Sequence, residues 1–136
     1  MNRTIIPVEM ILAARKIVLF METRDAGSLS DIFAPTVVIM DSFFPYIFEG
    51  QDAVDNWAKG FTSHAKNLTE LRHSFGDPQE FTFKGNKAFI SIPVTWEGKA
   101  DGVPFYETGG MALVFINIDG CWKIQNYAWA ATSFKN

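Results

Sequence analysis

An aspartate that follows a short apolar stretch is the residue of this chain best placed to do chemistry. Residues 37–40 are apolar and mostly β-branched, which predicts a strand that ends at Asp41. Residues 42–50 are unusually aromatic, so we expect them to form the rim of a pocket. A carboxylate among such rings loses solvation, which raises its proton affinity towards the range of a general base. The alternative is that Asp41 only begins a turn, with its side chain accepting a hydrogen bond from Ser42.

Strand parity adds a histidine to the candidates. Alternate side chains of a strand point to opposite faces of a sheet. In residues 71–75, the apolar Leu71 and Phe75 set an inner face that His73 shares. A carboxylate and an imidazole across an apolar pocket suit proton transfer, because one removes a proton while the other protonates an oxygen. The alternative for His73 is a core or rim histidine with no chemical role. On the strand of residues 88–96 we assign four side chains to the inner face: Ile90, Ile92, Val94 and Trp96.

Other polar residues are expected to play no chemical part. His64 follows a helix in a polar stretch, so we expect it to be solvated. Tyr106 and Glu107 precede Gly109-Gly110, which favours a turn; the alternative is that they line the mouth of the pocket. The single Cys121 can form no intrachain disulfide, and no Cys/His spacing suggests zinc. We therefore expect no metal and no cofactor, and a reducing, cytoplasmic compartment.

Length and composition restrict the class of protein. The chain has 136 residues, of which 48% are hydrophobic and 15% aromatic, so we expect one folded domain over residues 1–136 rather than a disordered chain. The net charge is −3 and the basic residues are scattered, which argues against nucleic-acid binding. The apolar stretch 8–21 is interrupted by Glu9, Arg15 and Lys16, so it predicts an amphipathic helix rather than a signal peptide or a membrane span.

The order of elements predicts an α+β fold. A helix is expected over residues 5–24 with Thr4 as its N-cap, and a short second helix around Leu29, Ile32 and Phe33 that Pro35 ends. A third helix should cover residues 51–60. From Leu71 onward, turn signals at 76–78, 85–86, 98–102 and 119–120 separate four or five antiparallel strands in a meander. Helices on one face of a curved, mostly antiparallel sheet are the simplest packing.

Several stretches resemble a known family. They are Asp25 with residues 32–38 and Asp41, then residues 50–54, and the closing residues 120–124 with Trp129, all within the order helix, helix, strand, helix and four strands. Together they resemble the nuclear transport factor 2-like superfamily, in particular its SnoaL-like polyketide cyclase and ketosteroid isomerase branch. The resemblance spans nearly the whole chain. It implies a cone-shaped, cystatin-like α+β barrel with a deep apolar pocket, and it leaves the reaction open.

The same resemblance suggests site residues. Asp41 occupies the position that resembles the general base of ketosteroid isomerases, and Trp129 that of a pocket aromatic, which brings Tyr127 and Gln125 to its side. The catalytic candidates are thus Asp41, His73 and Tyr127, although Tyr127 equally fits a core ring. The branch also uses a tyrosine and a protonated acid as oxyanion donors, and Ile17 and Ala112 stand at those positions here. The residues expected to contact substrate are Phe43, Phe44, Tyr46, Phe75, Trp96, Gln125 and Trp129.

The leading functional hypothesis is an enzyme that moves a proton on an apolar, ring-containing carbonyl compound, with Asp41 as base and His73 or Tyr127 as acid or hydrogen-bond donor. The first alternative is a non-catalytic module that binds a ligand or serves as a dimeric scaffold, and the second is the small subunit of a dioxygenase. Met111, Leu113 and Phe115 are assigned to the outer sheet face, where an apolar patch predicts a homodimer.

Overall fold

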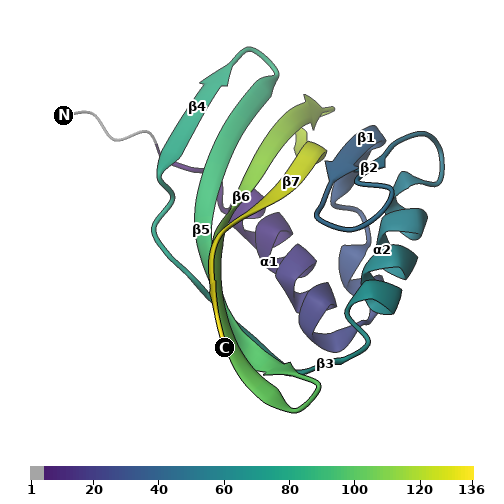
Figure 1. Ribbon diagram of the computed structural model, residues 1–136. Helices are drawn as coiled ribbons and strands as arrows, with labels where there is room; N and C mark the ends of the chain where they lie inside the picture. Colours follow the sequence, from purple (N-terminus) through teal and green to yellow (C-terminus); the bar gives the residue numbers. More distant parts are fainter. Residues whose placement is uncertain (1–4) are drawn as a thin grey trace.

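A computed structural model describes residues 5–136, so the predicted cap at Thr4 lies outside the described residues. Within these residues, two helices and seven strands follow one another, and the long antiparallel strands come last in the chain (Figure 1). The elements are α1 (Val8–Thr23), the 3-10 turn η1 (Ala26–Leu29), β1 (Phe33–Met40), β2 (Ile47–Phe48), α2 (Ala53–His64), β3 (Leu68–Phe75), β4 (Glu80–Lys84), β5 (Lys87–Ala100), β6 (Val103–Ile118) and β7 (Cys121–Lys135).

Helix α1 lies against the concave side of the sheet. It begins directly after Pro7 and ends at Arg24, whose left-handed backbone (φ 62°) turns its N–H back to the carbonyl of Phe20. Seven of its side chains are buried and recur at helical spacing, and one of them, Phe20, packs against helix α2: Met10, Ala13, Ala14, Ile17, Val18, Phe20 and Met21. Within residues 5–136, no helix has both the length and the apolar character that crossing a membrane requires.

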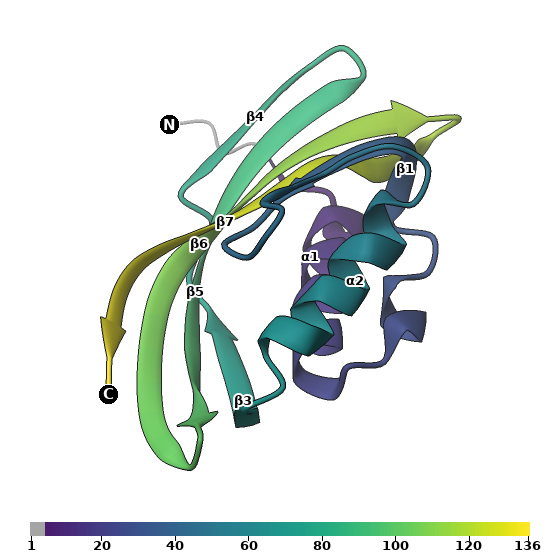
Figure 2. The same cartoon turned by 45° about the vertical axis from the view of Figure 1, so that its right-hand side comes forward.

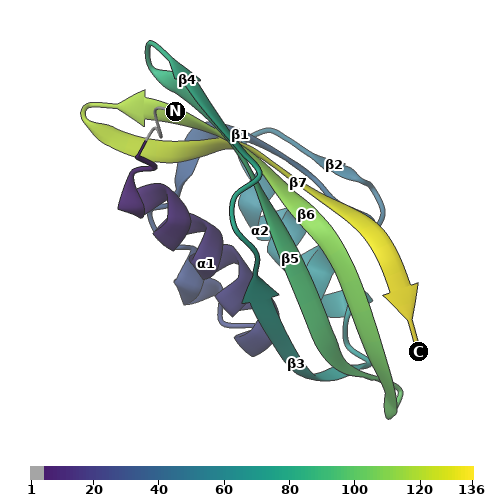
Figure 3. The same cartoon turned by 90° about the vertical axis from the view of Figure 1, so that its left-hand side faces the viewer.

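The strands form one sheet in the order β2-β1-β7-β6-β5-β3, with β4 also paired to β5. Strands β1 and β7 run parallel, and the other pairs are antiparallel. The long strands β5, β6 and β7 curve around the helices without closing (Figure 2), and both helices lie on one face of the sheet (Figure 3). The predicted α+β class, with a curved and mostly antiparallel sheet around N-terminal helices, is confirmed.

The predicted second helix is wrong. Only the single turn η1 precedes Ser30, and Phe33 already belongs to strand β1. Pro35 does not end a helix but lies inside β1, at the point where the pairing with β7 changes register between Phe33 and Val38. Because proline has no backbone N–H, a strand accepts it where the ladder is interrupted in this way.

The inner face of the sheet shows that Met111, Leu113 and Phe115 were assigned to the wrong side. Met111 pairs with Ile92 and Leu113 pairs with Ile90, and directly opposed residues share a face. All five side chains are at most 1% exposed and belong to the core. The sequence does not show which set of alternating side chains of β6 faces the core, because the other set is apolar as well: Ala112, Val114 and Ile116. The homodimer stays a prediction, and the outer face would present these alternate residues instead.

Two adjacent glycines of β6 provide a test of how closely the inner face is packed. A methyl group on Gly109 would lie 2.6 Å from the ring of Trp129 and would also collide with the carbonyl oxygen of Ala130, whereas on Gly110 it would meet nothing closer than 3.9 Å. We expect Gly109→Ala to lower the free energy of unfolding by about 1–3 kcal/mol, measured by urea denaturation. Gly110→Ala is the matched control and should be close to neutral. Equal effects of the two substitutions would contradict the described position of Trp129.

Candidate active site

A cavity of about 410 Å³ lies between the helices and the inner face of the sheet. Its apolar wall consists largely of rings, from Phe43, Phe61, Trp96, Phe105, Trp129 and Phe134. Its polar lining comes from Asp41, Ser42, His64, Asn67 and Glu107. Apolar walls with a few polar groups are typical of a site for a small organic molecule.

Asp41 is held at one side of this cavity by two elements. It follows β1 directly, and its Oδ1 accepts a hydrogen bond from the backbone N–H of Ser42 (2.7 Å). Its Oδ2 accepts a second one from Nε1–H of Trp57 on helix α2 (2.9 Å). The turn-forming bond to Ser42 that the sequence suggested is therefore present, and it coexists with a carboxylate that lines the cavity.

The surroundings of Asp41 act on its proton affinity in opposite directions. Burial raises the pKa of the Asp41 carboxyl, and the hydrogen bonds from Trp57 and Ser42 and the nearby His64 oppose that rise without cancelling it. A raised pKa makes the carboxylate a stronger base at a pH where it is still ionised. The direction of this pKa shift is the one expected for a carboxylate among rings, although two rings of the 42–50 loop, Phe44 and Tyr46, are exposed.

Glu107 is a second carboxyl group in the same cavity. The favoured turn at this point is wrong, because Glu107 lies inside the long strand β6. The alternative, in which Glu107 lines the pocket, agrees with the structure. Burial, and then the charge of Asp41, raise the pKa of Glu107. The alternation of Phe105, Glu107 and Met111 indicates a strand, which continues through Gly109-Gly110.

His64 is exposed, as expected, but it also lines the cavity, and its ring is stacked on Phe43 with centroids 5.2 Å apart. Helix α2 extends to His64 instead of ending near Gly60, which carries the imidazole to the cavity.

Tyr127 lies behind the cavity wall. Its side chain is fully buried, it packs edge-on against Trp57, and its hydroxyl has no hydrogen-bond partner among the described residues. Burial, and then the charge of Asp41, raise the pKa of Tyr127 well above its usual range. The phenol therefore keeps its proton, and the charge of the nearby Asp41 contributes to this. Tyr127 does not line the cavity. Its catalytic role stays a prediction.

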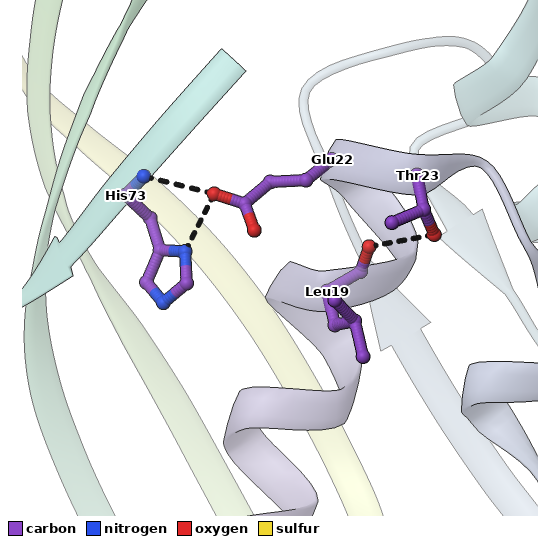
Figure 4. Close-up of polar contacts among 4 residues, drawn as sticks. All are labelled: Leu19, Glu22, Thr23 and His73. Atoms are coloured by element: carbon purple, nitrogen blue, oxygen red, sulfur yellow. Dashed lines mark hydrogen bonds and ion pairs between the residues drawn. The ribbon is translucent and has the colours of Figure 1, made fainter.

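His73 forms a pair with Glu22 instead of facing Asp41 (Figure 4). Its Nδ1 lies 2.7 Å from Glu22 Oε2, and its backbone N–H donates to the same oxygen at 3.0 Å. Both side chains are about one-fifth exposed (19% and 20%). The pair joins the last turn of α1 to β3. The residue after Glu22, Thr23, donates a hydrogen bond from its Oγ1 to the carbonyl of Leu19 in the same turn. His73 lines a separate groove beside α1, although its ring packs against Trp96 of the cavity wall (5.8 Å).

Three of the seven predicted contact residues line the cavity: Phe43, Trp96 and Trp129. Phe44 and Tyr46 are instead exposed (80% and 56%), and Phe75 lies under the guanidinium group of Arg15. Gln125 is bonded to Thr36 of β1. The register of β6 with β7 shifts at this point, so Gln125 and Tyr127 do not share a face.

The part of the chain that the structure describes contains no group of three or more His, Cys, Asp and Glu side chains that could hold a metal ion.

The bond between Trp57 and Asp41 can be tested through the proton affinity of the carboxyl. Trp57→Phe removes the donor that most opposes the effect of burial, so we expect the pKa of Asp41 to rise further. The pKa of Asp41 in the variant and in the wild type is measured by carboxyl ¹³C NMR across a pH titration. Trp122→Phe, an indole outside this cavity, is the control and should leave the titration unchanged. A fall in the pKa of Asp41 in Trp57→Phe would contradict the described bond.

Tyr127 provides a stability test. Its hydroxyl is buried without a partner, so Tyr127→Phe removes an unsatisfied polar group and should stabilise the fold by about 1 kcal/mol. Thermal unfolding followed by circular dichroism measures the change, with Tyr106→Phe as an exposed control that should be neutral. Destabilisation by Tyr127→Phe alone would indicate that the hydroxyl does have a partner in solution.

The sequence matches no family model and no curated protein. Solved structures do match it. The hexachlorocyclohexane dehydrochlorinase LinA-type3 from Novosphingobium barchaimii superposes with a TM-score of 0.80 at 12% identity, covering 94% of this chain and 87% of that one. A putative scytalone dehydratase from Novosphingobium aromaticivorans gives 0.71 at 15% identity, with 94% and 87% covered.

A nuclear transport factor 2-like superfamily protein from Salmonella enterica gives a TM-score of 0.72 at 14% identity, with 92% of this chain and 90% of that one covered. Such low identities over nearly the full length show a common fold and leave the reaction open. The chain therefore has the nuclear transport factor 2-like fold that its sequence resembles.

Proposed function

We propose that the protein is an enzyme that moves a proton on an apolar, ring-containing carbonyl compound, without a cofactor and with Asp41 as general base. The observation that carries the proposal is the position of this carboxylate, which lines an aromatic cavity while Trp57 and Ser42 fix both of its oxygens. A base in this setting is oriented before the substrate arrives, which lowers the cost of reaching the transition state.

The chemical step needs no group beyond the cavity and its substrate. The Asp41 carboxylate takes a proton from the carbon next to the carbonyl, and the electron pair of that C–H bond moves to give an enolate. Returning the proton to another carbon gives an isomer, and loss of a leaving group from the neighbouring carbon gives an elimination product. Two of the proteins with this fold are named a dehydrochlorinase and a dehydratase, and both names denote eliminations.

The Glu22–His73 pair supports a second candidate base. A carboxylate 2.7 Å from one imidazole nitrogen fixes the orientation of the ring and leaves the other nitrogen to act as the base. This arrangement favours His73 if the substrate reaches the groove beside α1 rather than the cavity of Asp41. The two candidates predict different effects of the same pair of substitutions, so one experiment separates them.

Deuterium exchange into ring ketones tests the proposal. We expect the protein to accelerate the exchange of the protons next to the carbonyl of indanone or tetralone in D₂O. The loss of their ¹H NMR signals over time measures the rate. Asp41→Asn should slow this exchange about 100-fold or more, because it removes the base. The rate should rise with pH as Asp41 ionises, with its midpoint above the ordinary aspartate range because burial raises its pKa.

Asp55→Asn, on the exposed face of helix α2, is the matched control and should retain the full rate. Loss of exchange in His73→Asn with full exchange in Asp41→Asn would transfer the role of base to His73. Saturable binding of the ketones without any acceleration of exchange would leave the non-catalytic binding module as the correct hypothesis.

A further inference from the structure

Glu107 stands out on the inner face of β6. Between Phe105 and Phe115, the other positions of its parity on this strand are buried and carry an apolar side chain or none: Phe105, Gly109, Met111, Leu113 and Phe115. Glu107 alone brings a charge to this row, and it lines the cavity. It has no hydrogen-bond or ion-pair partner within residues 5–136. A carboxyl at such a position costs stability unless something compensates for its lost hydration.

Aromatic residues are the neighbours of Glu107 in the sheet. Trp96 of β5 and Phe134 of β7 are its direct partners in the antiparallel ladders on either side. Phe105 lies two residues along the same face of β6, and its ring is stacked on Phe134 with centroids 5.7 Å apart. Glu107 and these three neighbouring aromatic residues line the same cavity.

Within residues 5–136, no Lys or Arg lines the cavity, although the guanidinium group of Arg24 lies 5.2 Å from the ring centroid of Phe61 in its wall. In the neighbouring groove, Lys99 is paired with Glu70 (2.9 Å) and Arg72 with Glu97 (3.5 Å), and Lys135 also lines that groove. Among the described residues, the basic side chain that lines the cavity itself is His64 of α2, which is stacked on Phe43. Asp41 of β1 adds a second carboxylate, so an anionic ligand would be repelled and a cation attracted.

We propose that Glu107 and the rings of Trp96, Phe105 and Phe134 form a subsite for an organic ammonium group. A cation over an aromatic face is attracted by the ring, and the attraction is stronger when both are removed from water. The carboxylate of Glu107 adds an ion pair with the same group. The substrate class is thus a ring-containing carbonyl compound that carries a basic nitrogen, and compounds with a carboxylate or phosphate are excluded.

The part of this inference that concerns the carbonyl group rests on the proposed function, with Asp41 as the base. The binding of the ammonium group is independent of the proposed function, because Glu107 and the three rings make that contact without any proton transfer. A cationic nitrogen near the carbonyl also withdraws electrons and makes the adjacent C–H bond more acidic, which suits removal of its proton by Asp41.

Two probes of nearly equal shape and different charge test the subsite. They are choline and dimethylbutanol, in which a carbon atom replaces the quaternary nitrogen. We expect the wild-type protein to bind choline at least about tenfold more tightly than dimethylbutanol. Chemical-shift changes of the indole groups of Trp96 and Trp129 during titration with each probe measure the two affinities. Glu107→Gln should reduce this preference to about threefold or less, and it should leave dimethylbutanol binding unchanged. Glu97→Gln, one residue from Trp96 and outside the cavity, is the control with the same change in net charge and should retain the preference.

The pH dependence provides a second readout. Choline should bind more tightly as the pH rises and the carboxyls of Asp41 and Glu107 ionise, and the binding of dimethylbutanol should not follow this course. Equal affinity for the two probes, absence of saturable choline binding, or an effect of Glu107→Gln on dimethylbutanol instead of choline would overturn the proposal. Failure of the proposed function would be distinct, because it appears in the exchange of Asp41→Asn and not in choline binding.

Discussion

The hydrogen bond from Trp57 to Asp41 joins the parts of the fold that create the cavity. Trp57 is completely buried in α2, and its ring packs against Phe20 of α1 and Tyr127 of β7. Its one polar atom is satisfied by the carboxylate that follows β1. A single side chain therefore fixes both helices against the sheet and orients the candidate base. Loss of this contact would leave a buried indole N–H and a desolvated carboxylate without their partners.

The cavity contains two carboxyl groups that would be better solvated at the protein surface, so keeping them in the cavity costs free energy of folding. Asp41 and Glu107 both lie in a mostly aromatic lining, and burial raises the pKa of each. The folded state thus binds their protons more tightly than the unfolded chain does. These two groups favour folding at low pH, and their contribution is lost as the pH rises through their folded pKa values. Such a cost is typical of residues kept for binding or catalysis rather than for stability.

The sequence predicted the fold class, the strand before Asp41 and the hairpin turn between β6 and β7 because each depends on local signals. Asp119-Gly120 adopts the positive φ values that a two-residue hairpin turn requires. The face of β6 could not be predicted, since both alternating sets of its side chains are apolar. The position of Gln125 depends on a register shift between β6 and β7 that no local residue signals. The Glu22–His73 pair joins a helix to a distant strand, so its two members had no visible relation in the sequence.

The proposed function depends on Asp41 being a desolvated carboxylate that can accept a proton. Titration of its ¹³C-labelled carboxyl group by NMR in the unliganded wild-type protein measures this property. We predict a pKa clearly above the value of about 3.9 that an aspartate has in a model peptide. A value at or below that reference would show that the carboxyl is well solvated or ion-paired in solution, and would contradict the account of Asp41 as the base of an apolar cavity.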